Sequence, residues 1–289
     1  MSLPEPLFAM ALPIVLFLAL WALIVAPLAH IVRAVRAVAR RGSARLARSA
    51  AGANITRHAG PFARYAPILV LVLVGGLAAL GAGALFVELA EHLRRTTSTI
   101  NAADQAVQTW FSHERQPALT ILLSFMTTFG GTLALALIVV AVAVVLLVRH
   151  DRATAIFLMV TTVSGALLNL GLKLIFARAR PDLESAIAVA RWFSFPSGHA
   201  MGSFITFGTL SYIALRQRWR WRVRSACLAL AATMVVLVGL SRVYLGVHWM
   251  SDIAGAWSAG TVWLATAIVA FEMLAGLRRR HLAIKHEVT

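Results

Sequence analysis

Long apolar segments alternate with short polar or basic connections along most of this chain. Seven of them approach the length of about 20 apolar residues that a helix needs to cross a hydrocarbon core about 30 Å thick. They cover residues 8–32, 66–90, 119–148, 154–176, 199–215, 225–246 and 252–276. The segment 199–215 is the shortest, and arginines from Arg216 to Arg224 mark its end. The pattern predicts an all-α integral membrane protein with seven spans.

The composition supports the membrane class. The chain has 289 residues, of which 60% are hydrophobic and only 13% are charged, and its mean hydropathy is +0.81. A soluble domain has about 25% charged residues. The single cysteine, Cys227, excludes a disulfide framework or a cysteine-based metal site within the chain, and we expect it to pack in the interior. No Lys or Arg precedes the first apolar segment, which predicts an uncleaved helix rather than a signal peptide.

The basic residues indicate the topology. The net charge is +16, and 19 of the 27 Lys and Arg residues lie in alternate connections and the C-terminal tail. These are Arg33, Arg36, Arg40, Arg41, Arg45, Arg48, Arg57, Arg64, Arg149, Arg152, Arg216, Arg218, Arg220, Arg222, Arg224, Arg278, Arg279, Arg280 and Lys285. Because cytoplasmic connections are rich in Lys and Arg, we expect the connections 91–118, 177–198 and 247–251 to face outward. This distribution argues against nucleic acid as a partner.

The expected organisation is one membrane domain with basic additions. We expect an extra N-terminal transmembrane helix at 1–33, a basic cytoplasmic loop at 34–65, a six-helix membrane domain at 66–276 and a basic cytoplasmic tail at 277–289. The arginines of the loop either lie on anionic lipid as an amphipathic helix or serve only to set the topology.

Two shorter features concern packing. Residues 101–117 carry Val107, Trp110 and Phe111, which indicates a short helix. It either rests on the outer interface near a lipid entrance or is an ordinary surface helix. Four glycines of the second apolar segment are expected to permit close helix packing. They are Gly75, Gly76, Gly81 and Gly83.

Three short strings carry the chemistry, and the first supplies cations. Lys173 ends the fourth apolar segment, Arg180 follows seven residues later, and Pro181 prevents the helix from continuing. A single cation at a helix end commonly extends to the membrane interface, and we expect Arg178 to be such an anchor. Lys173 and Arg180 gain a functional interpretation only from the other two strings.

The second string, Pro196-Ser197-Gly198-His199, opens the fifth apolar segment. A helix N-terminus presents free N–H groups and a partial positive charge, which favour an anion. Ser197 can cap the helix or donate its hydroxyl, and Gly198 permits a close approach to the backbone. His199 would then stand beside the bound anion, although a helix cap with an incidental histidine has the same pattern.

The third string runs from Ser241 to Asp252. Arg242 presents a planar fork of donors suited to phosphate oxygens. Asp252 lies four residues after His248, so it can accept from one imidazole nitrogen and leave the other as a nucleophile or base. Asp252 is also suited to cap the last helix. Since three cations and one carboxylate favour an oxyanion over a metal, we expect no metal and no other cofactor.

Together, Lys173-x6-Arg180-Pro181, Pro196-Ser-Gly-His199 and Ser241-Arg242-x5-His248-x3-Asp252 resemble the three signature motifs of the type 2 phosphatidic acid phosphatase superfamily, which includes vanadium haloperoxidases. The resemblance covers about residues 66–276. It implies a six-helix phosphatase core in which His248 is the nucleophile, Asp252 orients it and His199 protonates the leaving group. It also implies phosphate binding by Lys173, Arg180, Ser197, Gly198 and Arg242, without a metal.

The resemblance and the topology lead to an expected function. We expect a bacterial inner-membrane phosphatase with an outward-facing site that acts on a membrane lipid phosphate or pyrophosphate. Undecaprenyl pyrophosphate is the preferred substrate, with phosphatidylglycerophosphate and phosphatidic acid as alternatives. A lipid phosphotransferase would use the same phosphohistidine, and a non-catalytic lipid transporter or scaffold is the alternative from another class. The seven spans argue against a haloperoxidase.

Overall fold

The computed structural model describes residues 66–94, 99–181, 186–188 and 192–288, and every regular element in these ranges is an α-helix. The helices are α4 (Ala66–Leu93), α5 (Thr99–His113), α6 (Pro117–Thr128), α7 (Thr132–Val148), α8 (Arg152–Phe176), α9 (Gly198–Arg216), α10 (Trp221–Tyr244) and α11 (Met250–Val288). The all-α prediction is confirmed. The predicted first helix at 1–33 and basic loop at 34–65 lie outside the described residues.

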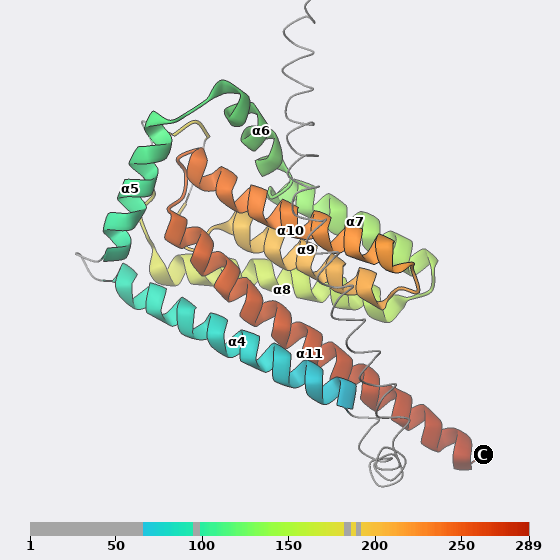
Figure 1. The fold of residues 1–289 in the computed structure, drawn as a ribbon. Helices are drawn as coiled ribbons and strands as arrows, with labels where there is room; N and C mark the ends of the chain where they lie inside the picture. Colours follow the sequence, from blue (N-terminus) through green and yellow to red (C-terminus); the bar gives the residue numbers. More distant parts are fainter. Residues whose placement is uncertain (1–65, 95–98, 182–185, 189–191, 289) are drawn as a thin grey trace, which may run out of the picture.

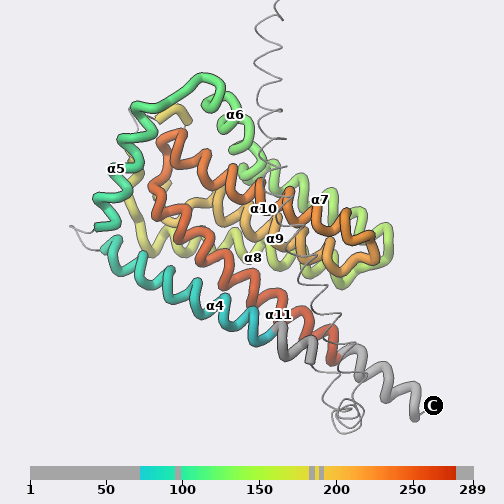
Figure 2. Tube along the Cα trace, viewed as in Figure 1, coloured from blue at the N-terminus to red at the C-terminus, as the bar shows by residue number. Residues whose placement is uncertain are grey.

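The long helices run side by side, and α9 lies among α8, α10 and α11 (Figures 1 and 2). Helix α4 packs along α11, whereas α5 crosses one end of the bundle. Tight contacts of small residues bring α9 and α11 together. A side chain at Gly260 would meet Phe204, and one at Gly208 would meet Leu264. The buried centre of the bundle is therefore built around α9.

Several helices are long and apolar enough to cross a membrane. In the described residues these are α4, α8, α10 and α11, and α6 with α7 forms a fifth if the bent pair counts as one span. Helix α9 has 19 residues but is not among them. It buries hydroxyl side chains of Ser203, Thr206 and Thr209, which neighbouring helices shield from lipid. The total of seven spans stays a prediction.

The expectation of a single helix over 119–148 is wrong. The chain breaks between α6 and α7, and the two helix axes differ by 50°. The backbone N–H groups of Gly130 and Gly131 bond the carbonyls of Thr127 and Thr128. A side chain at Gly130 would collide with Val238 of α10 and contact His199 of α9. Only glycine fits at position 130. The close approach that it permits brings the start of α7 against His199 of the second string.

The remaining helices agree with the apolar segments, with shifts at their ends. Segment 225–246 corresponds to α10, which ends at Tyr244 because Gly246 adopts a positive φ of 80°. Helix α11 continues to Val288, through the stretch expected to be a basic tail. On α4, a side-chain carbon added at Gly75 or Gly83 would lie within van der Waals reach of α11, whereas one added at Gly76 or Gly81 would meet no atom within 4 Å in the described part of the chain. The packing role expected for the four glycines therefore holds for two of them.

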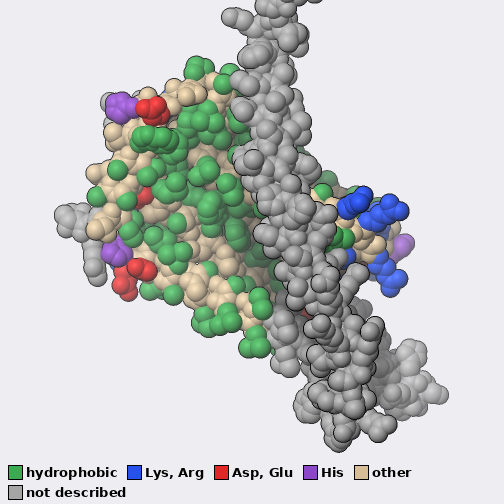
Figure 3. All heavy atoms as spheres, in the orientation of Figure 1, with side chains coloured by type: hydrophobic (Ala, Val, Ile, Leu, Met, Phe, Trp, Pro, Cys, Tyr) green, Lys and Arg blue, Asp and Glu red, His purple; other side chains and the backbone are tan. Residues whose placement is uncertain are grey.

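The surface is apolar along the helices and charged at the ends. Leu77, Leu80, Leu133 and Leu137 are more than half exposed, as expected for side chains that face lipid. In the view of Figure 3, hydrophobic side chains cover the middle of the bundle, and the visible Lys and Arg residues gather near the α7–α8 and α9–α10 connections. Acidic and histidine side chains appear at the opposite end, where α5 lies.

Candidate functional site

The three strings lie together at the end of the bundle crossed by α5 (Figure 1). The first follows the C-terminus of α8, the second begins α9, and the third joins α10 to α11. Because neighbouring helices are antiparallel, these four helix ends share one face of the membrane domain. The cations of Arg180, Arg242 and Lys173 and the imidazole of His248 are close enough to interact electrostatically with His199.

A tight turn after α10 places His248 beside Asp252. Gly246 takes the left-handed conformation, and the N–H groups of Val247 and His248 both bond the carbonyl of Arg242. His248 Nδ1 then lies 3.1 Å from Asp252 Oδ2. The pair is buried, with His248 only 2% exposed and Asp252 fully enclosed. The four-residue spacing therefore produces the predicted pair.

The contacts of His248 define its tautomer. Arg180 Nη1 lies 3.1 Å from Nε2 of His248, and a guanidinium can only donate. Nε2 is therefore the acceptor, and Nδ1–H donates to Asp252. Burial lowers the pKa of His248 to about 4, with Arg180 and Arg242 acting in the same direction and Asp252 opposing them. The imidazole is neutral at pH 7, so Nε2 carries the lone pair that a nucleophile or base needs.

Two cations, one at the end of α8 and one in the segment after it, are held by backbone carbonyls. Lys173 Nζ donates to the carbonyl of Phe193 at 2.7 Å and to that of Ser194 at 3.4 Å. Arg180 donates to the carbonyls of Trp192, Phe193 and Val247 over 2.6–3.2 Å. The carbonyls orient both side chains without neutralising them, because they carry no net charge. The charges remain available for an oxyanion.

Arg242 supplies a third cation. Its Nη1 donates to Thr127 Oγ1 at 2.9 Å, at the end of α6. The residue is only 5% exposed, and its buried Nε has no hydrogen-bond partner in the described part of the chain. A buried donor without a partner costs free energy, and a phosphate oxygen would satisfy it.

The start of α9 completes the arrangement. Ser197 is the N-cap, and its hydroxyl accepts from the N–H of Ala200 at 3.5 Å. A side chain at Gly198 would come within 3.2 Å of Asn169 Oδ1, so glycine favours the close packing of α9 against α8. His199 lies beside the glycines of the α6–α7 break. All eight predicted site residues therefore lie at these four neighbouring helix ends, although the role of each stays a prediction.

Arg178 is not the interfacial anchor that we expected. Its Nη1 donates to Asp252 Oδ1 at 2.7 Å, and its Nη2 donates to Asp104 Oδ2 at 2.9 Å. The chain leaves α8 through Ala177, which is left-handed with a φ of 44°, and this turn directs Arg178 inward. The expectation failed because the two carboxylates come from other helices.

Sequence reasoning also missed Asp104 and Ser194. Asp104 lies on α5 and is only 4% exposed. Ser194 is fully buried, and its hydroxyl donates to Asp252 Oδ2. One signal for Asp104 was available, because a carboxylate is rare in a chain with only 11 acidic residues. Neither interpretation offered for residues 101–117 anticipated that α5 reaches the site.

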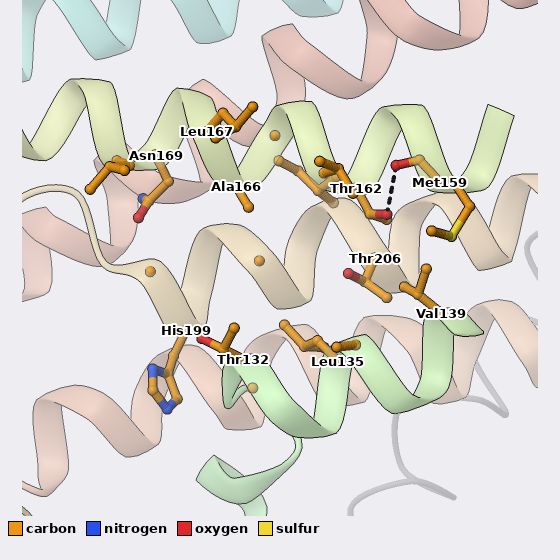
Figure 4. Close-up of a pocket in the computed structure, with 18 of the residues that line it drawn as sticks. Thr132, Leu135, Val139, Met159, Thr162, Ala166, Leu167, Asn169, His199 and Thr206 are labelled. Carbon is orange, nitrogen blue, oxygen red and sulfur yellow. Dashed lines mark hydrogen bonds between the residues drawn. The ribbon is translucent and has the colours of Figure 1, made fainter. Parts of the chain in front are cut away.

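An apolar cavity extends from the site between α7, α8 and α9. Its volume is about 630 Å³. Asn169, Lys173 and His199 lie at its polar end, and Leu135, Val139 and Met159 line the apolar part. Figure 4 shows His199 and Asn169 toward one end and Val139 and Met159 toward the other. The cavity therefore joins the cations to the hydrophobic interior.

The donor set does not resemble a metal centre. Among the described residues, no group of three or more His, Cys, Asp or Glu side chains is placed to hold a metal ion. The nearest charged neighbours of His199 and His248 include three cations. The arrangement suits a phosphate oxyanion, and the metal-free mechanism stays a prediction.

The sequence is similar to those of known proteins. Residues 153–275 match the PAP2 superfamily, and this region contains all three strings. Phosphatidylglycerophosphatase B of Bacillus subtilis is 28% identical over 165 residues, which cover 57% of this chain and 81% of that protein. An undecaprenyl-diphosphatase of Sulfolobus acidocaldarius is 28% identical over 145 residues, covering 47% of this chain and 64% of that protein.

The fold also matches a solved structure. The crystal structure of a transmembrane PAP2-type phosphatidylglycerolphosphate phosphatase from Bacillus subtilis superposes with a TM-score of 0.63. The sequence identity is 26%, and the match covers 68% of this chain and 96% of that one. The resemblance inferred from the three strings is confirmed for residues 153–275, which match the PAP2 superfamily.

Proposed function

We propose that this chain is a membrane lipid phosphatase that works through a phosphohistidine on His248, without a metal. The observation that carries the proposal is the neutral His248, whose Nε2 faces Arg180 while Asp252 holds Nδ1. Relatives that are named phosphatases of lipid substrates support the activity.

The first step is phosphoryl transfer to His248. The phosphate lies among Lys173, Arg180 and Arg242, with the buried Nε of Arg242 as one donor. The Nε2 lone pair forms a bond to phosphorus, and the bond from phosphorus to the leaving oxygen breaks. Asp252 stabilises the positive charge that develops on the imidazole. With the phosphate anion bound among the cations, His199 enters the reaction as the imidazolium and gives a proton to the leaving oxygen, and the cations stabilise the spread negative charge.

The second step releases phosphate. His199, now lacking that proton, takes one from a water molecule as the water attacks phosphorus. The bond between phosphorus and Nε2 breaks, and its electron pair returns to the imidazole. Inorganic phosphate leaves, and both histidines regain their starting forms. A lipid hydroxyl in place of water would make the chain a phosphotransferase, so product analysis separates the two reactions.

The cavity supports a lipid substrate. Met159 and Lys173 both line it and lie 14 residues apart on α8, a distance of about 21 Å at 1.5 Å per residue. One leaflet of hydrocarbon is about 15 Å deep, half of a core about 30 Å thick. The cavity therefore suits the phosphate-proximal part of one lipid chain. Among such lipids we prefer undecaprenyl pyrophosphate, a single-chain lipid whose pyrophosphate is left outside during carrier recycling.

The test measures phosphate release from a panel of lipids by the purified full chain in detergent. The panel contains undecaprenyl pyrophosphate, phosphatidylglycerophosphate and phosphatidic acid, each with and without a strong chelator. We expect free phosphate in at least one case, no loss with chelator, and the highest kcat/KM with undecaprenyl pyrophosphate. Absence of hydrolysis across the panel would contradict the proposed activity. Chelator inactivation that Mg²⁺ or Zn²⁺ reverses would contradict the metal-free mechanism.

A further inference from the structure

A buried chain of charges links Asp252 to a helix outside the region that matches the PAP2 superfamily. We propose that Arg178 and Asp104 are positioning residues that fix the carboxylate of Asp252, and through it the imidazole of His248. Asp104 lies on α5, before residues 153–275. The inference rests on the proposed phosphatase function and adds two residues that the three strings do not assign.

The guanidinium of Arg178 divides its two amino groups between two carboxylates. Nη1 donates to Asp252 Oδ1 at 2.7 Å and to Ser251 Oγ at 2.8 Å. Nη2 donates to Asp104 Oδ2 at 2.9 Å. The Arg178 guanidinium also lies 5.5 Å from the ring centroid of Trp249, within cation–π range. A lysine offers no such planar fork, so it would not reproduce this geometry.

Arg178 restrains the plane of the Asp252 carboxylate from the side opposite His248. Oδ2 accepts from three donors: Nδ1 of His248, the N–H of Trp249 and the hydroxyl of Ser194. Oδ1 accepts from Arg178. Rotation of the carboxylate would break the charged bond to Arg178, so the ion pair resists that rotation. The acceptor for His248 Nδ1–H is therefore fixed in advance.

Asp104 in turn fixes Arg178. Its Oδ1 accepts from the backbone N–H of Ser251, and its Oδ2 accepts from the Ser251 hydroxyl as well as from Arg178. Ser251 is in the first turn of α11, where a negative charge is favoured. Asp104 is only 4% exposed and Arg178 15%. The contacts of Asp104 and Arg178 therefore connect α5, the segment after α8 and the start of α11 to the carboxylate of Asp252.

A purely structural ion pair would have the same distances, so the test must separate positioning from folding. Asp104→Asn keeps an acceptor for the Ser251 N–H and removes the charge that holds Arg178. The double variant Asp104→Asn/Arg178→Gln removes both charges, so neither is left buried without a partner. The matched control is Glu272→Gln. It removes the ion pair to Arg216 that joins α11 to α9 at the opposite end of the bundle.

The experiment measures kcat, KM and thermal unfolding for each purified full-length variant with the best lipid of the panel. We expect Asp104→Asn to lose about 10- to 100-fold in kcat, the range that loss of an outer hydrogen-bond partner costs at metal sites, with KM within a factor of two. The double variant should lose no more than Arg178→Gln alone, because the two residues act through one carboxylate. Glu272→Gln should keep the wild-type kcat while its unfolding temperature falls.

The outcomes are distinct. Wild-type kcat in Asp104→Asn, or a rise in KM alone, would overturn the positioning role. If Asp104→Asn does not fold, the kcat and KM of the double variant are compared with those of the wild type in its place. If the double variant does not fold either, Arg178→Lys is used. Arg178→Lys should keep the fold and lose kcat, and full activity there would overturn the proposal. Inactivity of the wild-type chain on the whole panel would instead refute the proposed function.

Discussion

Nη1 of Arg180 lies 3.1 Å from Nε2 of His248, on the opposite side of the imidazole from Asp252. The histidine is therefore held at both nitrogens, by an anion that accepts and a cation that donates. The cation covers the atom that would attack phosphorus. When phosphate binds, the guanidinium can transfer its hydrogen bond to a phosphate oxygen and release Nε2.

This relationship predicts an unusual acid limb in the pH profile. Because burial lowers the pKa of His248 from 6.5 to about 4, the imidazole stays neutral at pH values where most histidines are charged. The value of kcat/KM reports the free enzyme. We expect protonation of His248 to lower kcat/KM only near pH 4. The folded state should also lose stability as the pH falls from about 6.5 to about 4, since the unfolded histidine takes up its proton first.

The measurement needs a control for the substrate, because a phosphate monoester has a second pKa of about 6. Profiles with two substrates whose phosphate pKa values differ by about a unit separate the limbs. A limb that moves with the substrate belongs to the phosphate, and one that stays belongs to the enzyme. A stationary limb near pH 6.5 would contradict the assignment to a buried, neutral His248.

The cavity predicts selective loss of long-chain substrates. Ala166 lines it on α8 and is labelled in Figure 4. Ala166→Phe should fill part of the volume and raise KM for a long-chain lipid phosphate by about tenfold or more, equivalent to about 1.4 kcal/mol of lost binding. A water-soluble phosphate ester should keep its kcat/KM. The control is Leu77→Phe on the exposed face of α4, which should change neither value. Equal loss for both substrates in Ala166→Phe would contradict a chain-binding cavity.

The sequence predicts the long helices and the His248–Asp252 pair because both depend on local spacing. Apolar runs of about 20 residues define helices, and a four-residue separation keeps His248 within reach of Asp252 across the start of α11. The break after α6 was missed because the run 119–148 stays apolar on both sides of Gly130 and Gly131. Its cause lies elsewhere in the chain, in Val238 and His199.

Arg178 shows the limit of reasoning from local pattern. Its partners Asp104 and Asp252 each lie 74 residues away in sequence. An arginine beside a helix end is most often an anchor, and nothing within one turn of Arg178 indicates otherwise. The burial of two carboxylates around it depends on α5 crossing the end of the bundle, which a sequence pattern does not encode.

The distribution of basic residues predicts the sidedness of the site. In a variant with Cys227→Ala, a cysteine at the exposed Ile187 should react with an impermeant thiol reagent added to intact cells. A cysteine at the exposed Arg218 should react only after the membrane is opened. The reverse pattern would place the three strings in the cytoplasm and contradict the recycling of a carrier on the outer leaflet.

Trapping the covalent intermediate shows whether His248 carries the phosphoryl group. The wild-type chain is mixed with lipid phosphate labelled in its terminal phosphoryl group, quenched in alkali within one turnover and digested for mass spectrometry. We predict a phosphorylated peptide with the label on His248. No such label should form in His248→Ala, whereas His113→Ala, altered at an exposed histidine of α5, should label normally. Label on another residue, or turnover by a folded His248→Ala chain, would exclude His248 as the nucleophile.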